Sequence, residues 1–167
     1  MQDKAIAPEP ASFLIRLAAS VYEILLVAAV IFIASMPFAP FLRDIHSGWL
    51  THLYQLYLFA VLFAYFAAFW MRSGQTLAMK TWRIRLTDER GGPLDLRRAL
   101  LRFAVATALP LAGMALVYAL GGSVASVGWG ALAGWAVDWF TAFGDSERRF
   151  LHDRIAGTRM VRVPRKA

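Results

Sequence analysis

The sequence predicts an all-α membrane protein, a single domain over residues 1–167 built as a polytopic bundle of about four transmembrane helices. Of its 167 residues, 59% are hydrophobic and only 17% are charged, whereas soluble proteins average about 45–50% apolar and about 25% charged residues. The apolar residues fall in long blocks rather than in alternating stripes. Blocks of this length indicate membrane spans, because about 20 apolar residues cross the hydrocarbon core of a bilayer.

The first predicted span, residues 13–38, carries two ionisable side chains in an otherwise apolar stretch. Arg16 and Glu23 are separated by almost two helical turns, so both lie on one face, about 10 Å apart along the axis. The opposite face consists of Leu, Val, Ile and Ala. A charge at the bilayer centre costs about 2.5–3.5 kcal/mol on insertion scales, so we expect the polar face to meet protein or water.

The second predicted span, residues 53–71, is rich in aromatic side chains. Tyr54 and Trp70 lie near its opposite ends. Aromatic residues gather at the two membrane–water interfaces. We therefore expect both side chains to lie at these interfaces.

A polar and basic segment, residues 72–98, follows the second span. Within it, residues 82–87 alternate apolar and charged side chains as an exposed strand does, and Asp95 is a candidate cap for the next helix. In the basic tail, residues 144–167, a second short strand is predicted at 158–163. We expect the two strands to pair.

The third span is predicted at residues 99–120 and the fourth at 127–143. The fourth contains Gly130 and Gly134, a spacing that lets two helix backbones approach closely. Because it is short and rich in glycine, its sequence leaves open whether it crosses the bilayer fully or is partly re-entrant.

The basic residues predict the orientation. Eight Lys or Arg residues lie between Arg72 and Arg102 and seven follow Phe143, whereas Arg43 alone lies between the first two spans. By the positive-inside rule, both basic segments and both termini are cytoplasmic. The net charge of +7 therefore indicates contact with the lipid bilayer rather than with nucleic acid, for which no module signature is present.

Glu23 is the first candidate for chemistry, because an acid inside a membrane is a functional candidate by default. Burial disfavours its charged form unless a cation or hydrogen bonds compensate, and such a group can exchange a proton for a metal cation. The alternative is a structural Glu satisfied by Arg16 or by a polar group of another helix. For Arg16 itself, and for Asp138 about a turn from water, the structural interpretation is favoured.

The second candidate is the segment 148–158, which places His152 and Asp153 among three arginines just past the last span. Asp153 is expected to pair with Arg16 or with Arg102. His152 is either a proton relay or a hydrogen-bonding loop residue. The sequence has no cysteine, zinc-ligand spacing, nucleophile elbow or phosphate loop, so we expect neither an enzyme nor a bound metal or cofactor.

Four stretches together resemble the RDD family of bacterial membrane proteins, named for one Arg and two Asp residues. They are Arg16 with an acid seven positions later, residues 74–86 (GQTLAMKTWRIRL), residues 97–102 (RRALLR) and residues 151–158 (LHDRIAGT). The resemblance covers nearly the whole chain.

By position, the resemblance places the family's Arg on Arg16 and its second Asp on Asp153. The first Asp falls on Glu23, a departure that keeps the charge and adds a methylene. The resemblance implies an integral protein of the bacterial inner membrane. It also implies a role in transport, since cation/proton exchange has been suggested for some members.

Two functions fit these expectations. One is a small transporter exchanging protons for monovalent cations or moving another ligand, with Glu23 as titrating site, Arg16 as its charge partner, and Asp153 with Arg102 as a gate. Because no internal repeat is evident, such a transporter is expected to act as a homo-oligomer. The other is an accessory or assembly subunit that binds a membrane protein or lipid through the glycine face, the aromatic second span and the basic surface.

Overall fold

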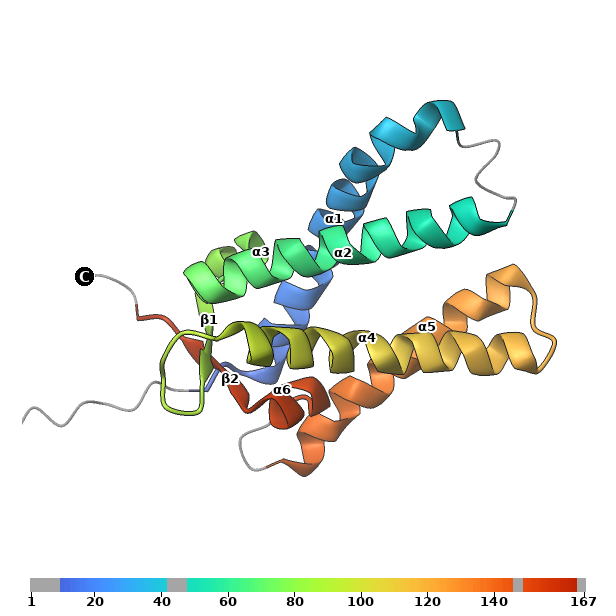
Figure 1. The fold of residues 1–167 in the computed structure, drawn as a ribbon. Coiled ribbons are helices and arrows are strands. Elements are labelled where there is room, and N and C mark those ends of the chain that lie inside the picture. The colour runs from blue at the N-terminus through green and yellow to red at the C-terminus, as the bar shows by residue number, and fades with distance from the viewer. Residues whose placement is uncertain (1–9, 42–47, 146–148, 165–167) are drawn as a thin grey trace, which may run out of the picture.

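A computed structural model describes residues 10–41, 48–145 and 149–164 as a helical bundle with a small sheet at one end (Figure 1). The long helices are α1 (Phe13–Ser35), α2 (Trp49–Arg72), α4 (Leu96–Ala119) and α5 (Val124–Phe140). The short elements are η1 (Met36–Phe41), α3 (Leu77–Thr81), β1 (Ile84–Asp88), η2 (Thr141–Gly144), α6 (Leu151–Ala156) and β2 (Thr158–Arg162). The predicted helical bundle is confirmed, and the ends of the four long helices lie within four residues of the predicted spans.

Within the part of the chain that the structure describes, three segments are long and apolar enough to cross a membrane: Phe13–Pro40, α2 and α4. Their outward surfaces are apolar; Leu25, Phe32, Leu56 and Leu116 each expose more than 60% of their surface. Contiguous apolar surface of this extent marks contact with a membrane or a partner. Together with the length of the helices, it makes this chain an integral membrane protein.

The sheet joins parts of the chain that are far apart in sequence. β1 and β2 pair antiparallel with Leu86 opposite Met160, which confirms the predicted strand pair. The N-terminal segment adds to the sheet, because Ala11 donates its backbone N–H to the Met160 carbonyl at 3.0 Å and Pro10 bridges Val161. We call this part of the molecule the sheet end.

The sheet also fixes the role of α5. β1 precedes α4 and β2 follows α5, so the two strands can pair only if an even number of crossings separates them. A crossing α4 therefore requires α5 to bring the chain back across the bilayer. α5 has 17 residues, which span roughly 26 Å at 1.5 Å per residue, and η2 extends it.

Two glycines of α5 pack directly against α4, as their spacing predicts. A Cβ added to Gly130 would lie 2.4 Å from the Gly113 carbonyl oxygen, and one added to Gly134 would lie 2.3 Å from the Leu109 carbonyl oxygen. Only residues without a side chain permit such backbone contact between helices. The glycine face of α5 is thus occupied within the bundle.

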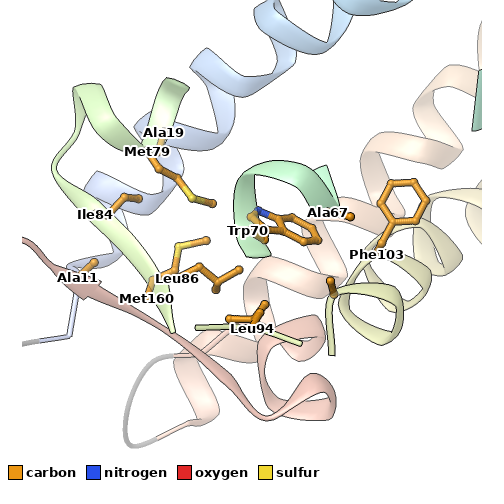
Figure 2. Close-up of a cluster of buried hydrophobic side chains, with 11 residues drawn as sticks. Ala11, Ala19, Ala67, Trp70, Met79, Ile84, Leu86, Leu94, Phe103 and Met160 are labelled. Carbon is orange, nitrogen blue, oxygen red and sulfur yellow. The ribbon is translucent and has the colours of Figure 1, made fainter. Parts of the chain in front are cut away.

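The hydrophobic core lies at the sheet end rather than midway along the helices. Figure 2 shows Ile84 and Leu86 of β1 with Met160 of β2 beneath the ends of α1, α2 and α4. Trp70 belongs to this core with 4% of its surface exposed, so it does not face lipid headgroups as a residue of an aromatic belt would. Its indole is covered by the guanidinium of Arg102, whose Cζ lies 4.8 Å from the ring centroid.

Two residues used in the sequence analysis, Arg43 and Arg148, lie outside the described residues. The prediction that Asp95 caps α4 is confirmed, because its side chain accepts the Arg98 backbone N–H at 2.8 Å.

Candidate functional site

A cavity of about 270 Å³ lies between the four long helices, next to the sheet end. Its walls are mostly apolar and aromatic, with Phe66 and Trp70 from α2, Phe103 from α4 and Trp135 from α5 among them. The ionisable side chains that line it are Arg16, Glu23, Arg102, Asp138 and His152. The structure thus brings five of the six predicted site residues to one cavity, and the sixth, Asp153, pairs with one of them.

Glu23 projects from α1 and its two carboxylate oxygens have different donors. Tyr65 of α2 donates its hydroxyl to one oxygen at 2.9 Å, and the Thr76 hydroxyl donates to the other. Thr76 is also the N-cap of α3, where its hydroxyl oxygen accepts the Met79 backbone N–H at 3.2 Å. The short helix α3 therefore fixes the position of one donor to Glu23.

Arg102 and Asp153 form a buried ion pair between α4 and α6. Nη1 of Arg102 lies 3.0 Å from Oδ1 of Asp153, and the side chains are 3% and 0% exposed. The same carboxylate oxygen accepts the Thr158 hydroxyl at 3.0 Å. Of the two predicted partners for Asp153, the structure shows Arg102. Removing either member of such a pair leaves an uncompensated charge.

His152 connects α6 to α5 through the Asp138 carboxylate. Its ring Nδ1 lies 2.6 Å from Oδ2 of Asp138, and its backbone N–H donates to Oδ1 at 3.1 Å. On the other side of the ring, Nε2 lies 3.8 Å from Oδ2 of Asp153. The imidazole is thus placed between two buried carboxylates.

Arg16 is buried in the first turns of α1, with 2% of its surface exposed. Its Cζ lies 5.1 Å from the centroid of the Phe150 ring, a cation–π arrangement. The described contacts of Glu23 are with Tyr65 and Thr76 rather than with Arg16. Arg16 and Glu23 line the same cavity.

Sequence reasoning missed both donors to Glu23. Thr76 lies within the stretch 74–86 that carried the family resemblance, which is the signal that could have found it. Tyr65 sits in an aromatic-rich span where one phenol hydroxyl has no distinguishing pattern.

Buried ionisable groups inside a bundle of apolar helices define a class of integral membrane protein with a polar interior site. Within this class the particular family is shown by comparison of sequences. Residues 10–157 match the RDD family, and the chain belongs to that family. No curated protein and no solved structure matches this chain.

Proposed function

We propose that this protein is a small transporter that exchanges protons for monovalent cations, with the Glu23 carboxylate as its exchange site. The observation that supports the proposal is the cavity, which places this carboxylate in a space of about 270 Å³ between membrane-crossing helices. An acid in this position is a candidate for ion or proton binding.

The surroundings of Glu23 suit a hard cation, which prefers oxygen ligands. The Tyr65 and Thr76 hydroxyls contact the carboxylate, and Ser20 lines the same cavity. A hydroxyl can donate to a carboxylate or turn a lone pair toward a cation. The same oxygens can therefore serve the site with and without a bound cation.

The proposal places the sheet end in the cytoplasm and the protein in the bacterial inner membrane. It is supported by the eight Lys or Arg residues between Arg72 and Arg102, since basic loops stay on the cytoplasmic side. The chain has no cysteine, so a single cysteine at Arg90 can be labelled in spheroplasts. Protection from an impermeant reagent until the membrane is broken is expected, and labelling of intact spheroplasts would reverse the orientation.

The alternative of an accessory subunit loses two of its supports. The glycine face of α5 packs on α4, and the aromatic residues Phe59, Phe63 and Phe66 of α2 contact Phe103 of α4. Both features have a use inside the fold. The basic surface fits either function, so we do not propose the accessory role.

Proton flux in proteoliposomes tests the proposal. The purified protein is reconstituted with a pH-sensitive dye inside, and Na⁺, Li⁺ or K⁺ is added outside. We expect a cation-driven pH change that Glu23→Gln reduces at least tenfold. The matched control is Glu89→Gln, which removes an exposed acid at the sheet end, paired at 3.5 Å with Arg149.

Absence of flux in wild-type protein that is folded and oriented would refute the exchange function. Equal loss of flux in the Glu89 and Glu23 variants would show a general effect of charge rather than a site at Glu23.

A further inference from the structure

We propose that His152 is a second proton-binding residue of this protein, distinct from Glu23, clamped between the carboxylates of Asp138 and Asp153. The inference rests on the proposed exchange function for its role in transport, but the proton-binding site itself can be tested without transport. The three side chains come from α5 and α6 and are all buried.

The first support is the geometry of the two ring nitrogens. An ionised carboxylate only accepts hydrogen bonds, so Nδ1, 2.6 Å from Asp138, carries a proton in the neutral ring. Nε2 then points a lone pair toward Oδ2 of Asp153 at 3.8 Å. That oxygen is buried and has no hydrogen-bond donor among the described residues. A proton on Nε2 would turn two facing lone pairs into a donor and an acceptor.

The second support is the balance of charge around the cavity. Among the described residues, Asp138 of α5 and Asp153 on its own helix lie beside the His152 ring. Arg102 of α4 pairs with Asp153, and Arg16 and Glu23 of α1 line the same cavity. Two guanidinium groups and three carboxylates leave one net negative charge when the imidazole is neutral. One added proton, on Glu23 or on His152, balances these described groups, and buried charge is tolerated when it is balanced.

The same balance links His152 to Glu23. Arg102 pairs with Asp153 and lines the same cavity as Asp138 and Glu23, so its positive charge acts on all three carboxylates. A metal cation at Glu23 would supply the missing positive charge, and a protonated His152 would supply it equally. Both together would leave an excess positive charge in a small cavity of low dielectric constant. Proton and metal cation are therefore expected to exclude each other.

A merely structural His152 would tie α6 to α5 through Asp138 and stay neutral at every pH where the protein is folded. The two roles differ in protonation, so protonation is what the experiment must measure. The full chain contains three histidines.

The test is a ¹⁵N NMR titration of histidine-labelled protein in lipid nanodiscs. Signals of the other two histidines are assigned with His46→Gln and His52→Gln, which leaves that of His152. We expect His152 to bind a proton reversibly while the fold persists, with both nitrogens hydrogen-bonded. Asp153→Asn should weaken proton binding about tenfold or more, because one carboxylate is lost. Asp88→Asn, at the last residue of β1, should leave it unchanged.

A His152 signal that stays neutral until the protein unfolds would overturn the inference, whatever the flux assay shows. The wild-type titration decides this even if Asp153→Asn does not fold. Replacing N-methylglucamine chloride by NaCl at equal ionic strength separates the two proposals. Weaker proton binding in Na⁺ supports their coupling, whereas titration that ignores Na⁺ keeps the proton site and refutes the link to exchange at Glu23.

Discussion

Two alanine substitutions on α5 should change stability in opposite directions. A Cβ at Gly134 would lie 2.3 Å from the carbonyl oxygen and 2.6 Å from the carbonyl carbon of Leu109, whereas a Cβ at Gly128 would have no heavy atom within 4 Å. We expect Gly134→Ala to destabilise the protein and Gly128→Ala to stabilise it. The two positions share one helix and one substitution, so each is the control for the other.

The magnitudes follow from these contacts. The atoms that the new methyl group meets at Gly134 belong to the backbone of α4 and cannot rotate away, so the helices must separate by about 1 Å locally. Overpacking of this kind costs about 1–3 kcal/mol. Alanine gains about 0.5–1 kcal/mol over glycine inside a helix. At Gly134 the loss exceeds the gain, and at Gly128 only the gain remains.

Thermal unfolding of the purified variants in one detergent measures the difference. For a chain of this size a change of 1 kcal/mol moves the midpoint by about 2–4 °C. We expect a lower midpoint for Gly134→Ala and a slightly higher one for Gly128→Ala. If the midpoint rises equally in both variants, the α4–α5 contact is not as close as the glycines indicate, and the reasoning is refuted.

Two further variants test the charges. Arg102→Met should lower the free energy of unfolding by about 3–5 kcal/mol because Asp153 keeps a buried charge without its partner. Adding Asp153→Asn to this variant should recover part of the loss. If the losses of the two single variants simply add in the double variant, the two side chains do not form a direct pair. The backbone N–H of Gly92, and after it the Arg98 guanidinium, hold the pKa of Asp88 below its ordinary value. The stability this gives to the sheet end is present above about pH 4 and should be lost as the pH falls through the lowered pKa of Asp88. Amide hydrogen exchange in β1 of the wild type should therefore speed up on acidification more than in Asp88→Asn. Equal acid sensitivity in the two proteins would exclude this contribution of Asp88.

The long helices could be predicted because their signal is local. A run of about 20 apolar residues indicates a membrane span wherever it occurs, and the basic flanks separate one span from the next. The short helices α3 and α6 were not predicted. They have five and six residues, too few to show a period, and helices this short form through their tertiary contacts.

The site could be predicted only in part, for the same reason. The step from Arg16 to Glu23 places both on one helix face, and both line the cavity. The donors to Glu23 are 42 and 53 residues away in sequence, and no periodicity connects positions so distant. For Trp70, the local sequence signal was misleading. Its place near the end of a span indicated an interface residue, but the Arg102 that covers it comes from another helix.

The site draws groups from near both ends of the chain as well as from its middle, and this gives the small sheet a role in positioning them. Arg16 and Glu23 come from α1, whereas Asp138 and His152 come from the last turns of α5 and from α6. Pairing of Ala11 and β1 with β2 brings the start of α1 to the end of α6. The sheet thus holds the charged groups of the cavity at fixed distances, and a change in strand register would alter the cavity without replacing any residue that lines it.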